Sequence, residues 1–138
     1  MSQIRNLNSR VWESLLKKSG VDAFTGAQGR ILYVLWEYEK LTISEIGRMT
    51  SLAKTTLTSM LDRMEAAGLV TRIPDKENRR QIFIKVTDKA KEYQEKYDWL
   101  ADKMNSIFYQ DFNEAEIYEF EDKLRKILSN LEMEEDKQ

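Results

Sequence analysis

Short hydroxyl side chains and an arginine lie close together in the middle of the sequence. In KTTLTSMLDRM, residues 54–64, Thr55, Ser59 and Arg63 recur every four residues and would share one helix face. Hydroxyls can bind phosphates or base edges, and an arginine can form two hydrogen bonds with a guanine. Threonine and serine are poorer helix formers than Glu, Lys or Gln, so this face suggests a bound partner, the alternative being a solvated helix. The candidate contact residues are Lys54, Thr55, Thr56, Thr58, Ser59 and Arg63.

A second group of positive charges follows in PDKENRRQIFIKVT, residues 74–87. Two segments rich in β-branched residues, 69–73 and 81–87, flank the charged run, which predicts a hairpin with a charged tip. An arginine on a thin hairpin fits a narrow minor groove, whereas the alternative is a solvated turn with weak ion pairs. We expect Asp75 to pair with Arg80 and Arg79 to project. The candidate contact residues are Arg72, Lys76, Arg79 and Arg80.

The composition excludes several classes of chemistry. Among its 138 residues the chain has no cysteine and no histidine, which removes thiolate nucleophiles, disulfides and the commonest zinc ligands. Serine–histidine and cysteine–histidine catalysis are excluded for the same reason. We therefore predict a protein that is not an enzyme and needs no cofactor. Because no apolar run is long enough to cross a bilayer or to form a signal peptide, we expect a cytoplasmic protein without a membrane partner.

The net charge of −2 conceals an uneven distribution. Residues 48–91 carry ten basic and five acidic side chains, whereas residues 92–138 carry six basic and fourteen acidic ones. A basic segment within an acidic chain indicates a local electrostatic footprint for a negative partner. Charge asymmetry by itself is also compatible with an ordinary solvated surface.

Helices are expected to position both groups. Apolar residues recur at helical spacing in residues 4–18, and two Thr-x-x-Gln/Glu capping boxes begin further helices at Thr25 and Thr42. The hydroxyl-rich helix follows a short turn, runs from about residue 54 to 67 and should end at Gly68. After the hairpin, Thr87 should start one long helix, and Asn113 should cap the last helix.

The order helix, turn, helix, strand, charged loop, strand predicts a winged helix–turn–helix. The fold class is therefore mainly α with a small β-hairpin wing. We expect a single domain over residues 1–138, in which residues 25–87 form the winged helix–turn–helix lobe. The flanking apolar stripes, such as Ile4/Leu7/Val11 and Leu124/Ile127/Leu131, are too extensive for one small core to cover, and exposed patches of that size mark an interface.

The segment LTISEIGRMTSLAKTTLTSMLDRMEAAGLVTRIPDKENRRQIFIKVTDKA resembles the winged-helix core of MarR-type (multiple antibiotic resistance regulator) transcription factors. The motifs that carry the resemblance are TSMLDRMEAAGLVTR, a D-x-x-x-x-R wing from Asp75 to Arg80, and a strand that ends in threonine before a helix. A leading helix, a second helix in FTGAQGRIL and two C-terminal helices extend the resemblance over nearly the whole chain. The sequence departs from the family pattern at Glu77, where a basic residue is usual, and at Ala53, where serine often caps the helix.

The resemblance implies a homodimer held together by helices in residues 1–20 and 88–138. Such a dimer would present two copies of helix 54–67 to half-sites of double-stranded DNA about one helical turn apart, giving a pseudo-palindromic operator. The family fold also implies a repressor relieved by a small organic effector, bound between the dimerisation helices and the DNA-binding lobe. Aromatic residues that could line this pocket are Trp12, Phe24, Tyr33 and Trp36, each of which is otherwise a plain core residue. A winged helix that binds another protein without reading DNA is the alternative function.

Overall fold

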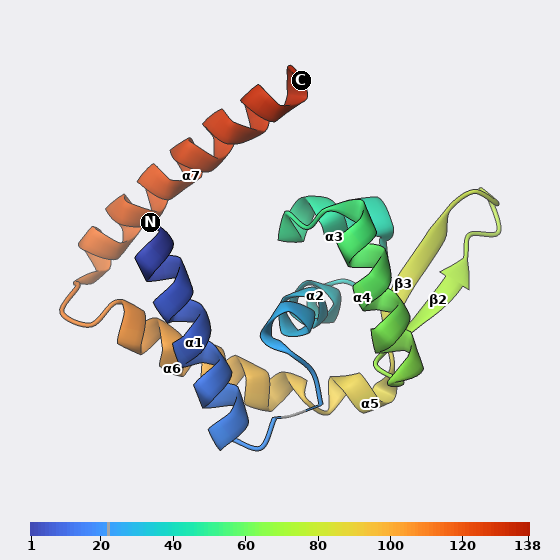
Figure 1. The fold of residues 1–138 in the computed structure, drawn as a ribbon, viewed down its shortest axis with the longest axis horizontal. Coiled ribbons are helices and arrows are strands. Elements are labelled where there is room, and N and C mark those ends of the chain that lie inside the picture. The colour runs from blue at the N-terminus through green and yellow to red at the C-terminus, as the bar shows by residue number, and fades with distance from the viewer. Residues whose placement is uncertain (22) are drawn as a thin grey trace. The chain divides into compact units, whose positions relative to one another are not determined.

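The computed structural model describes residues 1–21 and 23–138, which divide into two compact units, residues 1–102 and 103–138. The first unit contains the winged helix–turn–helix and all of the described strands (Figure 1). No helix among the described residues has the length and apolar character needed to cross a membrane. The helices are α1 (Ser2–Lys18), α2 (Gly26–Glu37), α3 (Ile43–Thr50), α4 (Lys54–Ala66), α5 (Asp88–Lys91), α6 (Gln94–Phe108) and α7 (Glu114–Asp136), and the strands are β1 (Leu41–Thr42), β2 (Val70–Pro74) and β3 (Ile82–Val86).

Local side-chain hydrogen bonds fix where the helices begin and end. Thr25, Thr42 and Asn113 each accept a hydrogen bond from the backbone N–H three residues on, and each forms the capping box that the sequence predicts. Ala53 stands at the N-cap of α4 and offers no side-chain cap. Gly68 ends this segment with a φ of 77°, a left-handed conformation that favours glycine. These signals are local, so the sequence alone is sufficient to place them.

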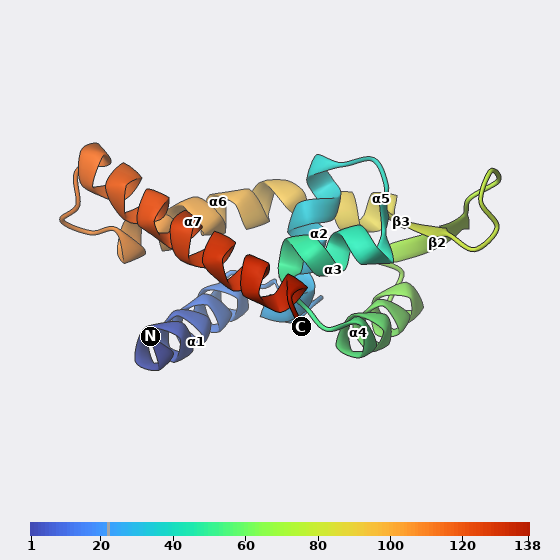
Figure 2. The ribbon, with the colours of Figure 1, turned by 90° about the horizontal axis from the view of Figure 1, so that it is seen from above.

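The sheet has three antiparallel strands in the order β1-β3-β2. The hairpin β2–β3 is the predicted wing, and its tip extends beyond the other elements of the first unit in both Figure 1 and Figure 2. The sequence does not predict β1, because two residues are too few to show an alternating pattern. Leu41 and Thr42 of β1 pair with Ile84 and Phe83, which joins the root of the wing to the start of α3.

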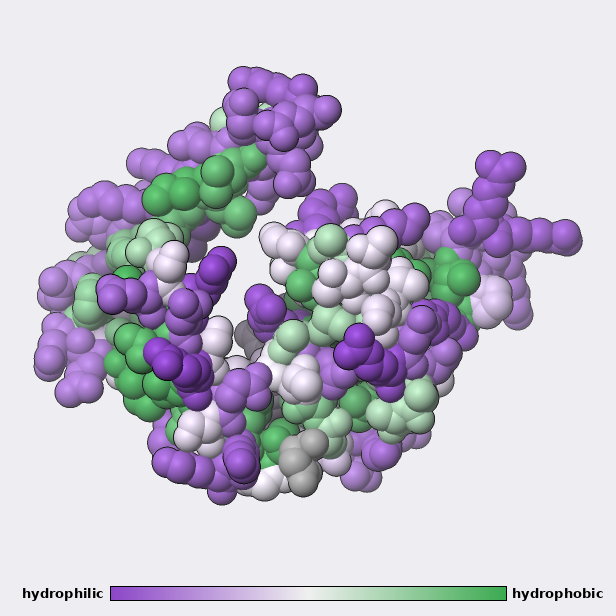
Figure 3. Space-filling view, in the orientation of Figure 1, coloured by the Kyte–Doolittle hydropathy of each residue, from purple (hydrophilic) through white to green (hydrophobic). Residues whose placement is uncertain are grey.

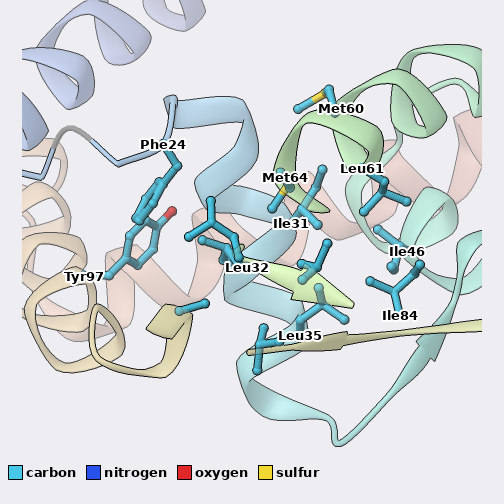
Figure 4. Packing of buried hydrophobic residues seen from close by; sticks show 14 of the residues in the cluster. Phe24, Ile31, Leu32, Leu35, Ile46, Met60, Leu61, Met64, Ile84 and Tyr97 are labelled. Atoms are coloured by element: carbon cyan, nitrogen blue, oxygen red, sulfur yellow. The ribbon is translucent and has the colours of Figure 1, made fainter. Parts of the chain in front are cut away.

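The core of the first unit lies between α2, α4 and the sheet. Ile31 and Leu32 of α2 face Leu61 and Met64 of α4, and Ile84 of β3 closes the cluster (Figure 4). All five side chains are fully buried. Because burying a Leu, Ile or Met contributes about 1.5–3 kcal/mol, this cluster fixes the rotation of α4 about its own axis.

The predicted long helix after Thr87 is interrupted, which corrects the sequence-based expectation. The short helix α5 ends at Lys91 and α6 begins at Gln94. At the break the Ala90 carbonyl accepts hydrogen bonds from the Tyr93 N–H at 3.2 Å and from the Trp36 indole at 3.2 Å. The indole of Trp36, on the distant helix α2, thus binds the Ala90 carbonyl at the point where one continuous helix would have run on.

Helix α1 is attached to the first turn of α2 by one carboxylate. Glu13 Oε1 accepts a hydrogen bond of 2.7 Å from the backbone N–H of Gly26. A Cβ at Gly26 would collide with this carboxylate and lie 3.2 Å from Trp12 Cδ1, so the contact needs a residue without a side chain. A carboxylate at a helix N-terminus also interacts favourably with the helix dipole.

The second unit consists of the end of α6 and the 23-residue helix α7. Within it, the Tyr109 hydroxyl donates a hydrogen bond of 2.8 Å to Glu121. No residue of α7 is buried, although the helix carries a continuous apolar side, visible as a green stripe in Figure 3. The exposed members of this stripe are Phe120, Leu124, Ile127, Leu128 and Leu131.

Candidate nucleic-acid interface

The outward face of α4 carries the hydroxyls that the sequence places there. Thr55, Thr56 and Ser59 are exposed, and Thr58 is half-buried at the edge of the face. Arg63 is exposed and donates a hydrogen bond of 2.9 Å to the Ser59 hydroxyl. The opposite side of the helix is buried, so these groups can only point away from the core. The face therefore offers hydrogen-bonding groups and one positive charge at fixed positions.

A hollow of about 520 Å³ lies beside this face, between α4 and the first turn of α2. From α4 it is lined by Thr55, Thr56, Ser59 and Arg63, and from α2 by Thr25 and Gln28. No carboxylate is present among the described residues that line it. The first turn of α2 is thus part of the same polar surface, which sequence reasoning missed because only the fold brings α2 beside α4.

Arg72 on β2 is bound within the lobe. Its guanidinium forms ion pairs of 2.8 Å with Asp62 and 2.8 Å with Glu65, both on α4. Partial desolvation favours a lower pKa for Arg72, but the hydrogen bonds to the two carboxylates outweigh it and raise the pKa above its ordinary value. The side chain is 22% exposed. Arg72 therefore joins the wing to α4, a contact that its assignment as a DNA-binding residue did not anticipate.

The tip of the wing is organised by short hydrogen bonds between neighbours. Asp75 accepts a 2.9 Å hydrogen bond from the Glu77 backbone, and Asn78 accepts one of 3.2 Å from the Arg80 backbone. Over the described chain no ion pair joins Asp75 to Arg80, so the expected pairing is not seen in this structure. Both bonds hold a tight turn from which exposed cationic side chains extend. These are Lys76, Arg79 and Arg80.

A second hollow, of about 410 Å³, lies between the starts of α3 and α4 and the root of the wing. We call it the wing-root hollow. Lys54 from α4 and Arg80 from the wing line it together with Ser44 and Gln81. Sequence reasoning selected both cations separately and had no signal that would bring them together, because three separate segments form this hollow.

The four aromatic residues expected at an effector pocket surround Tyr97 of α6. The ring centroids of Trp12 and Trp36 lie 5.1 and 5.2 Å from that of Tyr97 in edge-on arrangements. Phe24 and Tyr33 pack against the same ring at 6.1 and 6.0 Å. Burial raises the pKa of Tyr97 to about 12, so its hydroxyl is neutral near pH 7. In this structure the aromatic rings pack on one another, and Figure 4 shows Phe24 directed at Tyr97.

Comparison with known proteins places this lobe in a family. The model of the MarR family matches residues 24–82. The HTH-type transcriptional regulator TtmR of Methylorubrum extorquens is 41% identical over 91 residues, which cover 66% of this chain and 45% of TtmR. The chain spans about half the length of the curated relatives it matches.

Two solved structures cover nearly the whole chain. Reduced AbfR bound to DNA is 30% identical, with a TM-score of 0.73, over 94% of this chain and 87% of AbfR. AbsC, a MarR family transcriptional regulator from Streptomyces coelicolor, has a TM-score of 0.84 at 24% identity, over 94% of this chain and 88% of AbsC. The second likeness, at under 25% identity, concerns the fold alone. The chain belongs to the MarR family.

Proposed function

We propose that this protein is a sequence-specific transcriptional regulator that binds double-stranded DNA through α4 and the wing. The observation that carries the proposal is the outward face of α4, where Thr55, Thr56, Ser59 and Arg63 are exposed on one side of a helix whose other side is buried. A helix of about 10–12 Å diameter fits the major groove, where these groups can reach base edges. The likeness to AbfR, whose structure is that of a complex with DNA, supports this function.

The wing would bind beside the same groove. Arg79 and Lys76 are exposed at the tip of a hairpin that extends beyond the helices. Arginine side chains favour a narrow minor groove, where the negative potential is strongest. In this proposal α4 reads the sequence, whereas the wing contributes mainly electrostatic affinity that depends on salt.

We propose further that the functional form is a homodimer on a pseudo-palindromic operator. Helix α1 exposes Ile4 and Leu7, which are 59% and 54% exposed, and α7 buries none of its residues. Unpartnered apolar faces on both flanking helices favour association with a second copy. A two-fold dimer would place its two α4 helices about one helical turn of DNA apart. Residues 1–20 and 88–138 are the proposed dimerisation segments.

The regulatory role that fits this architecture is repression relieved by a small organic effector. The proposed binding region is the aromatic cluster of Trp12, Phe24, Tyr33 and Trp36 around Tyr97. An effector would have to separate some of these rings, and it would act only if it binds one arrangement of the helices better than another. Titrating effector candidates while recording tryptophan fluorescence and DNA release tests this step.

Selection from a random pool of duplexes tests the function directly. We expect an enriched pseudo-palindrome, bound by a dimer in sedimentation or gel-shift experiments at micromolar protein. Replacing Ser59 with leucine should change which half-site is preferred, because Ser59 lies on the groove-facing side of α4. A purified protein that is monomeric and binds no duplex in dilute buffer would refute the proposal.

A further inference from the structure

Two cations from distant parts of the sequence line the wing-root hollow. Lys54 begins α4, and Arg80 lies near the end of the wing loop, two residues before β3 begins at Ile82. Both are exposed, and the described chain provides no carboxylate partner for either side chain. No acidic residue is found among the described residues that line the hollow. Two unneutralised positive charges that share one hollow favour an anion over any other occupant.

The remaining lining residues supply donors and an apolar floor. Ser44 stands in the first turn of α3, and Gln81 follows Arg80. Within the described part of the chain, no side-chain hydrogen bond engages the Ser44 hydroxyl or the Gln81 amide. The hydroxyl of the neighbouring Thr42 is already used, since it donates to Glu45 at 2.9 Å. The free groups therefore number two charges, one hydroxyl and one amide, the donor set suited to a tetrahedral oxyanion.

The position of the hollow indicates which oxyanion it would receive. Lys54 immediately precedes Thr55 and Thr56 of the groove-facing side of α4. A helix in the major groove has a phosphate backbone on each side, so the strand on the wing side would pass the first turn of α4. We infer that the wing-root hollow seats a single phosphodiester of the DNA backbone, held jointly by Lys54 and Arg80, with Ser44 and Gln81 as additional donors. The inference rests on the proposed function and adds a shared phosphate to it.

The dependence of affinity on salt distinguishes one shared phosphate from two separate ones. Each neutralised phosphate contributes about 0.9 to the slope of log affinity against log salt. If Lys54 and Arg80 hold the same phosphate, the double variant Lys54→Ala/Arg80→Ala should lower the slope by about one. Lys54→Ala and Arg80→Ala alone should each leave the slope nearly unchanged, because the other cation still neutralises the shared phosphate, whereas the control Arg79→Ala should lower it by about one. Losses of about one in each of Lys54→Ala and Arg80→Ala, and of about two in the double variant, would overturn the inference.

Neutral methylphosphonate substitutions in the selected operator provide the direct test. At one position of each half-site, neutralising the phosphate should weaken binding of the wild-type dimer by about tenfold. On that duplex, Lys54→Ala and Arg80→Ala should each cost less than about twofold, whereas Arg79→Ala should keep its full effect. Separate sensitive positions for Lys54 and Arg80, or none for either, would overturn the inference while leaving the proposed function intact. A wild-type protein that ignores every duplex would overturn the proposed function itself.

Discussion

Replacing Arg72 with alanine separates a residue that contacts DNA from one that holds the wing in place. Arg72 binds Asp62 and Glu65 at 2.8 Å each, and the three side chains are 22%, 64% and 43% exposed. Exposed ion pairs contribute about 0.2–1 kcal/mol each. The loss of two such pairs and of the packed stem should lower the free energy of unfolding by about 1–2 kcal/mol. Urea denaturation at one fixed protein concentration measures this change.

The salt dependence of DNA binding gives the second readout for this variant. If both carboxylates remain bound to Arg72 in the complex, the slope of log affinity against log salt should stay unchanged in Arg72→Ala. Lys76→Ala, at the exposed wing tip, is the control and should lower the slope by about one. A slope lowered by one in Arg72→Ala, with unfolding unaffected, would refute the ion-pair assignment and restore Arg72 as a phosphate contact. A double-mutant cycle with Asp62→Asn then measures the coupling of that pair.

Three further predictions concern stability. Ala53→Ser should supply the missing N-cap of α4 and raise the free energy of unfolding by about 1 kcal/mol. A lower free energy of unfolding, measured by urea denaturation, would contradict this prediction. Gly29→Ala should lower the free energy of unfolding by about 1–3 kcal/mol, because a Cβ would lie 2.9 Å from Tyr97 Cε2. Ala27→Gly in the same helix is the control, since it measures the effect of backbone entropy. Because burial raises the pKa of Tyr97 from 10.0 to about 12, its contribution to stability is complete below pH 10 and is lost as the pH rises towards 12. Alkaline denaturation of Tyr97→Phe should show a smaller decline than the wild type, and identical curves would argue against the shift.

The parts of the fold that depend on neighbouring residues could be predicted from the sequence. Capping boxes, the left-handed Gly68 and the buried side of α4 all follow from patterns within a few residues. The winged helix–turn–helix was predicted from the order of such elements. Features that depend on distant contacts were not predicted. The strand β1 needs β3 beside it, and the break before α6 involves the Trp36 indole.

The candidate site follows the same division. Helical spacing is enough to identify the exposed face of α4, and a charged hairpin is enough to identify the wing. The partners of Arg72 lie seven and ten residues away on another element, so only the folded lobe shows that its charge is already compensated. The family resemblance, and not residue spacing, indicates the aromatic residues of the proposed effector region. Their common neighbour, Tyr97, lies on α6, and only the fold brings it beside rings from α1 and α2.

The hydrogen bond from Gly26 to Glu13 has a mechanical consequence. The same turn of α2 binds the carboxylate of α1 through its first backbone amide and lines the hollow beside α4 through Thr25 and Gln28. A shift of α1 must therefore either break this bond or carry the turn with it. Strain applied at α1 would thus reach the hydroxyl-bearing face of α4 through a single helical turn.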